Sequence, residues 1–132
     1  MQDLNTAALA KARAAWNAAQ VHAVGKVPDN PTTPYLVGSV SSGASVSPRL
    51  SGEHGGRPYR IVWQAVGRTL DEVTFAADKA DAAFLDQALS VTGQDCTLCE
   101  PEVTSPVIRD PDGGALLTCT LTYTFTAYPT GA

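Results

Sequence analysis

The sequence has no run of about 18 apolar residues that could cross a membrane as a helix. Its N-terminus also lacks the basic region and the continuous apolar core of a signal peptide, so we expect a protein that stays in the cytoplasm or in an assembly built there. Cysteine is scarce, with three residues in 132. An odd number of cysteines does not make a disulfide framework, and we expect all three thiols to be reduced.

Basic residues are few as well: 9 Lys and Arg stand against 13 Asp and Glu, for a formal net charge of −4. This balance argues against a general nucleic-acid binder, because such proteins collect Lys and Arg to displace counterions from phosphates. The charge is uneven, since residues 1–66 hold six basic and three acidic side chains, and residues 67–132 hold three basic and ten acidic ones. A dipolar subunit of this kind can stack head to tail in a ring, although one acidic surface helix would produce the same asymmetry.

The apolar pattern predicts two helices. Residues 3–20 are rich in alanine and place one stripe at helical spacing, with Trp16 as its anchor: Leu4, Ala8, Ala12, Ala15 and Ala19. The second helix begins at a capping box, in which Thr69 and Glu72 each satisfy an orphan amide, and it runs to about Ser90. Its expected buried stripe is Leu70, Val73, Ala77, Ala80, Phe84 and Ala88.

Several strands are predicted between and after the helices, at 21–27, 35–40, 57–66 and 118–126, with one interrupted or two short strands in 95–108. The last strand alternates threonine with apolar residues, so one of its faces is buried and the other is rich in hydroxyls. Residues 41–58 form a long loop or flexible hairpin tip, and residues 109–114 form a tight turn. We expect a single α+β domain over residues 1–132, with a mixed or antiparallel sheet of four to five strands and two helices packed on one face.

Catalytic patterns are incomplete throughout the chain. Cys96 and Cys99 have the spacing of a redox pair or of half a zinc site, yet an acidic, proline-containing segment follows where a redox pair needs a helix N-terminus. Cys119 could supply a third zinc ligand, but His22 and His54 are poorly spaced for a fourth. No nucleophile elbow or phosphate-binding loop is present. We expect no enzyme activity, no metal and no cofactor.

The order of elements, together with short apolar strings, resembles the family of bacteriophage tail terminator, or tail completion, proteins of long flexible-tailed phages. The resemblance rests on the N-terminal helix, residues 24–28, residues 34–38, residues 59–64, the helix after Thr69 and residues 118–125. It implies a subunit of a homohexameric ring that caps the tail tube, halts tube growth and joins the tail to the head-side connector or stopper protein. It further implies a location in the tail neck of the virion, assembly in the host cytoplasm, no membrane contact, and DNA that only passes through the lumen.

Two surfaces are candidate contacts with other subunits or partners. The first is the loop that holds Arg49, Glu53, His54 and Arg57, because loops can change assembly specificity at little cost to the fold. The second is the helix face with Phe75, Asp78 and Asp86, where an aromatic ring lies opposite the expected buried stripe.

Three other interpretations stay open at this point. The chain could be another phage neck or tail-tube component, because such proteins share small sheet-and-helix subunits and ring symmetry. It could be a small thiol oxidoreductase that uses Cys96 and Cys99. It could also be a monomeric binding module whose loop at 41–58 grips a peptide or a sugar.

Overall fold

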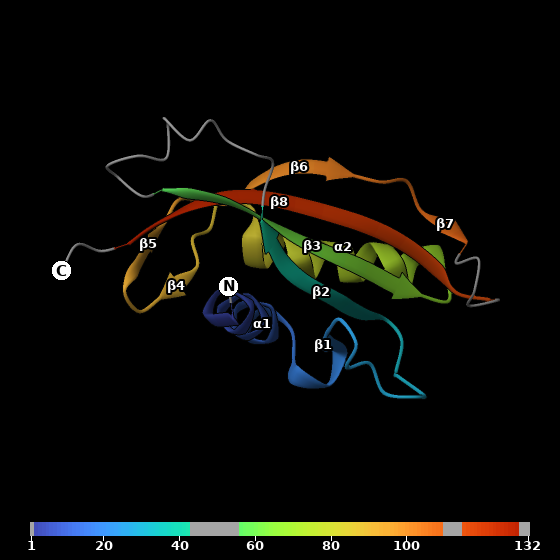
Figure 1. Cartoon of the computed structure of the whole chain (residues 1–132). Helices are drawn as coiled ribbons and strands as arrows, with labels where there is room; N and C mark the ends of the chain where they lie inside the picture. The colour runs from blue at the N-terminus through green and yellow to red at the C-terminus, as the bar shows by residue number, and fades with distance from the viewer. Residues whose placement is uncertain (1, 43–55, 110–114, 130–132) are drawn as a thin grey trace.

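The computed structural model describes residues 2–42, 56–109 and 115–129, and it contains one curled sheet with two α-helices (Figure 1). The helical elements are α1 (Gln2–Ala15), a short 3-10 turn η1 (Ala18–Gln20) and α2 (Leu70–Phe84). The strands are β1 (Val21–Ala23), β2 (Tyr35–Ser42), β3 (Arg57–Gly67), β4 (Ser90–Val91), β5 (Gln94–Cys96), β6 (Glu100–Thr104), β7 (Ile108–Arg109) and β8 (Leu117–Pro129). In the described residues, neither α-helix is long and apolar enough to span a membrane.

The three long strands β2, β3 and β8 pair antiparallel and form the centre of the sheet. β1 extends this sheet by pairing in parallel with β2, so the sheet is mixed. The free edge of β8 is shared by three short strands, because β5, β6 and β7 each pair with a different part of it, and β4 pairs with β5. The α+β class and the mixed sheet are thus confirmed, while eight short and long strands replace the four to five that were expected.

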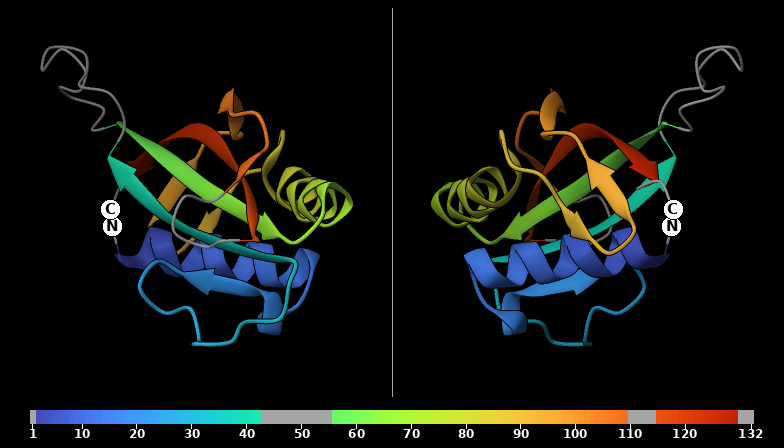
Figure 2. Two further views of the ribbon diagram at one scale, coloured as in Figure 1. Left: turned by 90° about the vertical axis from the view of Figure 1, so that its right-hand side faces the viewer. Right: turned by 90° about the vertical axis from the view of Figure 1, so that its left-hand side faces the viewer.

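Both α-helices pack on the same face of the sheet, which curls over them (Figure 2). The fully buried residues Leu4 of α1, Trp63 of β3 and Phe84 of α2 belong to one hydrophobic cluster. The rings of Trp63 and Phe84 stack with centroids 5.7 Å apart, and Phe84 also contacts Tyr123 of β8. α1 is tied to β2 by the side chain of Asn5, whose Oδ1 accepts a hydrogen bond from Val40 N at 2.7 Å.

Within the described residues, no helix covers the opposite face of the sheet. The threonines of β8 point to this side, because Cys119, Leu121, Tyr123 and Phe125 occupy the buried alternate positions. Across β8, the Nε of Arg60 and the Oε1 of Glu102 form an ion pair at 2.9 Å. The strict alternation that predicted this strand therefore gives the sheet a hydroxyl-rich outer surface.

Both helices end earlier than the sequence predicted. α1 stops at Ala15, because Asn17 takes an extended conformation and its Oδ1 accepts hydrogen bonds from the N–H groups of Ala19 and Gln20, which start η1 instead. α2 stops at Phe84 rather than near Ser90, since Leu85 has extended backbone angles.

Two further details of the predicted pattern are wrong. Leu70, assigned to the buried stripe of α2, is 58% exposed, because it lies at the first residue of the helix, where the core no longer covers it. The expected strand at 21–27 ends at Ala23, because Gly25 has a φ of 83° and turns the chain there. The loop expected at 41–58 is shorter at both ends, because residues 41–42 belong to β2 and residues 57–58 to β3, and the first residue of the turn expected at 109–114 belongs to β7. Residues 43–55 and 110–114 lie outside the described residues.

Candidate functional site

The cysteine pair lies where α2 gives way to the short strands. Cys99 is fully buried, its N–H donates to the carbonyl oxygen of Gln87 at 2.7 Å, and its carbonyl oxygen accepts from the N–H of Asp86 at 3.0 Å. Burial, and then the neighbouring Cys96, raise the pKa of the Cys99 thiol to about 11. Burial followed by the charge of Asp95 also raises the pKa of Cys96. A redox pair needs a lowered thiol pKa, so this environment suits a structural role for both cysteines.

The remaining cysteine has a similar environment. Cys119 is buried in β8 and its Sγ donates to the carbonyl oxygen of Ser105 at 3.2 Å. Burial is the main cause of the raised pKa of its thiol. Among the described residues, no group of three or more His, Cys, Asp or Glu side chains is placed to hold a metal ion.

His22 is buried on the outer side of the sheet, beside Tyr35. The two rings meet edge to face with centroids 5.7 Å apart, and His22 Nε2 finds no hydrogen-bond partner in the described part of the chain. Burial, with a smaller contribution from the charge of Arg13, lowers the pKa of His22. The side chain is therefore a neutral packing residue. His54 lies outside the described residues.

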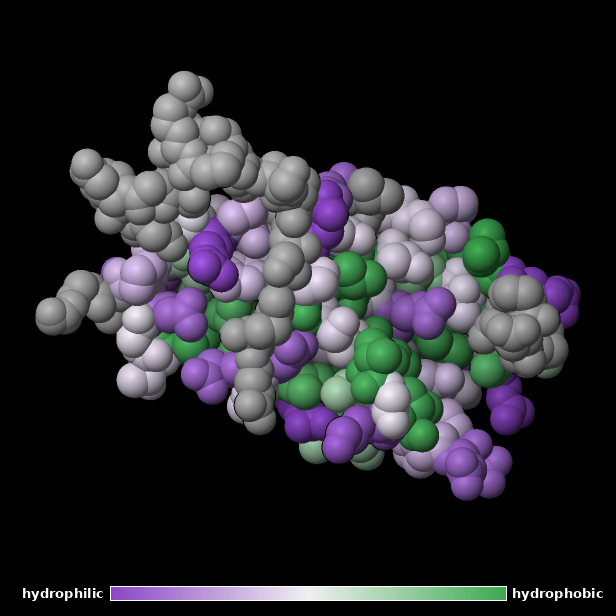
Figure 3. Space-filling model, viewed as in Figure 1, coloured by the Kyte–Doolittle hydropathy of each residue, from purple (hydrophilic) through white to green (hydrophobic). Residues whose placement is uncertain are grey.

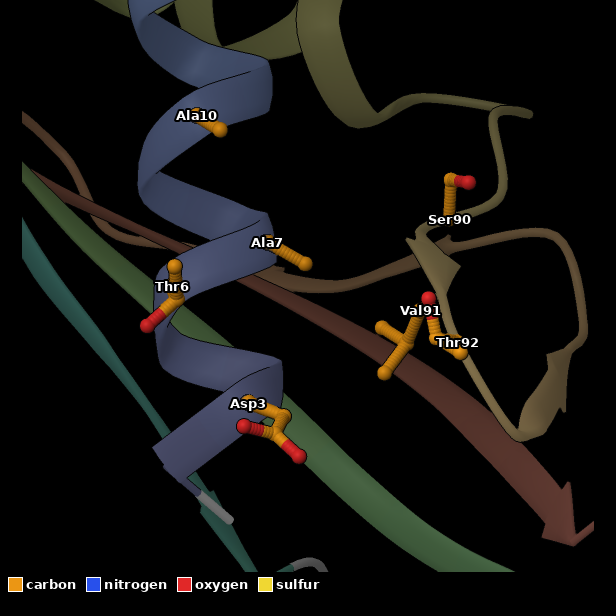
Figure 4. Close-up of a pocket in the computed structure, with 7 residues that line it drawn as sticks. All are labelled: Asp3, Thr6, Ala7, Ala10, Ser90, Val91 and Thr92. Atoms are coloured by element: carbon orange, nitrogen blue, oxygen red, sulfur yellow. The ribbon is translucent and has the colours of Figure 1, made fainter.

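Three of the surface depressions have similar volumes, and one of them, of about 390 Å³, is lined by Asp29, Tyr35 and Arg68 among other residues. One of about 410 Å³ lies between α1 and β4, and Figure 4 shows small side chains along it. Its lining residues are Asp3, Thr6, Ala7, Ala10, Ser90, Val91 and Thr92, of which only Asp3 is ionisable. Another depression, of about 440 Å³, lies on the outer side of the sheet, and Glu100 is its one ionisable lining residue. Its other lining residues are Pro58, Thr97, Leu98, Thr124, Phe125 and Thr126. In these two depressions a single carboxyl group does not make an acid and base pair.

The outer side of α2 is where the structure brings predicted contact residues together. Phe75 is 49% exposed and Asp78 is exposed three residues further along the helix. Phe75 is not isolated, because the ring of Trp16 meets it edge to face at 5.7 Å and Lys79 Nζ lies 5.1 Å from its ring centroid. The contact with Trp16 was missed, since nothing in the sequence shows where α1 ends relative to α2.

The other predicted contact residues are scattered. Asp86 is exposed two residues beyond the end of α2, with a φ of 58°. Arg57 is exposed at the first residue of β3. Arg49, Glu53 and His54 lie outside the described residues. On the face shown in Figure 3, apolar side chains form small groups among polar ones, which is the usual appearance of a protein surface.

Comparison with known proteins shows the fold alone. No family model matches the chain, and no curated protein matches it. A solved structure described as a virion of a native gene transfer agent particle superposes with a TM-score of 0.71, with 11% identity and 96% of each chain covered. A fold of this kind occurs in a virion particle. A second solved structure, without a descriptive name, gives a TM-score of 0.68 with 15% identity, covering 99% of this chain and 94% of the other.

Proposed function

We propose that this chain is a structural virion protein that forms a hexameric ring on the end of a phage tail tube. The ring terminates tube polymerisation and joins the tail to the head-side connector. The observation that carries the proposal is the likeness to the gene transfer agent virion structure, with a TM-score of 0.71 over 96% of both chains. Because that likeness covers nearly the full length, the whole chain corresponds to one subunit of the proposed ring.

The physical requirement for such a protein is a set of distinct surfaces. A tube grows without limit when each new ring offers the same face to the next, so a cap must bind the tube on one face and refuse a further tube ring on the other. Lateral contacts must also join unlike surfaces of neighbouring copies in order to close a ring. The uneven charge and the two differently covered faces of the sheet are compatible with this requirement.

The cysteine environment and the net charge are compatible with a structural role. The raised pKa values of Cys96 and Cys99 count against the thiol oxidoreductase. The net charge of −4 is compatible with a ring through which DNA passes without binding, because the like charge of protein and DNA keeps the duplex from adhering to the lumen.

The proposed contacts with neighbours, the tube protein and the connector involve two regions. One is the loop region with Arg49, Glu53, His54 and Arg57, of which Arg57 alone is described. The other is the outer side of α2 with Phe75 and Asp78, continued by Asp86.

The test is to express the chain together with the tube protein encoded by the same viral genome, and to measure tube lengths by electron microscopy. A terminator yields tubes with a narrow length distribution, whereas tube protein alone polymerises without a defined end. Unlimited tubes in the presence of the folded chain contradict the proposal. Incorporation along the whole tube supports the alternative, a tube component.

A further inference from the structure

The outward side of α2 combines an apolar centre with acidic flanks. Four exposed residues share it, because the buried side chains of the helix occupy the opposite stripe: Asp71, Phe75, Asp78 and Ala82. Within the described residues neither Asp71 nor Asp78 forms an ion pair. We call these four residues the α2 face. It presents a ring that packs against Trp16, with two carboxylates on the same side of the helix and Lys79 Nζ at 5.1 Å from the ring centroid.

The turn that follows β1 has the opposite character. Val24 is 63% exposed, Gly25 has a φ of 83°, and Lys26 is exposed and closes the turn by donating its N–H to the carbonyl oxygen of Ala23 at 3.0 Å. We call Val24–Lys26 the β1 turn. A second cation, Arg13, is exposed near the start of the same strand and donates from its guanidinium to the carbonyl oxygen of Val21 at 3.3 Å. The β1 turn thus offers one exposed apolar side chain, Val24, and one exposed cation, Lys26.

α1 separates the two surfaces. Its C-terminal end contacts the α2 face through Trp16 and the first strand through Arg13. One copy can therefore use both surfaces at once, each against a different neighbour. This is the geometric condition for a head-to-tail contact, in which unlike surfaces meet and repeated association closes a ring.

We propose that the α2 face of one copy docks on the β1 turn of a second copy of this chain. Opposite charge selects the partner, since the α2 face carries the exposed carboxylates of Asp71 and Asp78 and the β1 turn carries the exposed ammonium of Lys26. Phe75 and Val24 are the apolar centres that become buried. The inference deepens the proposed function, because it names the lateral contact of the proposed ring.

The test uses two complementary variants of the full chain. Asp78→Lys with Ala82→Lys makes the α2 face basic, and Val24→Glu with Lys26→Glu makes the β1 turn acidic. Each variant alone places like charges at every contact, so we expect its apparent dissociation constant for self-association, measured by sedimentation velocity, to rise about tenfold or more. In an equal mixture the two variants can alternate around the assembly, so that every contact joins a basic surface to an acidic one, and we expect assembly to be regained. A variant with all four substitutions also regains it.

The matched control is Asp95→Lys with Leu98→Lys, which makes the same change in charge at two exposed positions away from the α2 face. It leaves self-association unchanged, and thermal unfolding checks that every variant folds. A wild-type chain that stays monomeric at every concentration overturns the proposed contact. So does a mixture of folded variants that fails to regain assembly, or a control that weakens assembly as much as the α2 variant.

The tube-length assay separates this inference from the function on which it rests. Suppose that the wild-type chain limits tube length, but that the mixed variants do not regain self-association. This result overturns the proposed contact and still supports the proposed role as a tube cap. If the mixture regains self-association but tubes grow without limit in the presence of the wild-type chain, the proposed contact is supported and the proposed role as a tube cap is overturned.

Discussion

Gly38 of β2 lies directly against the indole ring of Trp63, and a Gly38→Ala substitution tests how tightly this part of the core is packed. A methyl group at this position would fall inside van der Waals distance of Trp63 Cε3 and would stand 2.5 Å from the carbonyl oxygen of Val62. Trp63 cannot move away freely, because it is fully buried and its ring stacks on Phe84. The carbonyl oxygen belongs to the backbone of β3, so it cannot yield without disturbing the β2–β3 pairing.

Overpacking of a well-packed core costs about 1–3 kcal/mol, and the two simultaneous clashes place this substitution near the upper end. We expect a loss of about 3 kcal/mol in the free energy of unfolding and a fall of roughly 10 °C in the midpoint of thermal unfolding. Urea and thermal unfolding measure both quantities. Trp63→Phe removes the Cε3 atom, so the double variant should lose less than the sum of the two single changes. A Gly38→Ala protein as stable as the wild type would refute the packing described for β2 and β3.

Three further substitutions have definite expected outcomes. His22 has a lowered pKa in the folded state, so the unfolded chain binds the proton more readily, and stability should fall as the pH drops below about 6.5; His22→Gln should flatten that dependence in urea unfolding. Thr69→Ala removes the oxygen that accepts from Glu72 N at 3.2 Å and should cost about 1 kcal/mol in the free energy of unfolding, whereas Thr69→Ser should cost much less. The pKa of Cys99 is raised to about 11, so its thiol should react with a thiol reagent at pH 8 far more slowly in the native protein than in urea. The Cys99→Ser variant identifies the part of the reaction that belongs to Cys99. Equal rates in the native and unfolded proteins would contradict the burial of Cys99.

The elements predicted well from the sequence are those with strong local signals. Thr69 caps α2 as expected, and Glu72 satisfies a neighbouring amide by accepting from Arg68 N at 2.7 Å. The alternation of threonine with Cys119, Leu121, Tyr123 and Phe125 placed β8 and its buried face. In both cases adjacent residues determine the structure, so the pattern is visible without the rest of the chain.

The features that were missed depend on contacts between distant residues. α2 ends at Phe84 where the following segment bonds to the backbone of Cys99, and no glycine or proline in the sequence marks that point. One interrupted or two short strands were predicted within 95–108, and the structure has β5, β6 and β7 in this part of the chain. Their number and bounds depend on pairing with β8, which the local pattern does not show. The exposure of Phe75 was predicted from helical periodicity, whereas its contact with Trp16 depends on how α1 and α2 pack.

We propose that copies of this chain form a ring at the end of a tail tube. The most direct measurement is electron microscopy of purified tubes assembled with the chain, with averaging of images of their ends. We predict one additional six-fold ring at a single end of the tube, and the ring should be absent when the chain is omitted. Tube ends that look the same with and without the chain, or added density repeated along the tube, would contradict it.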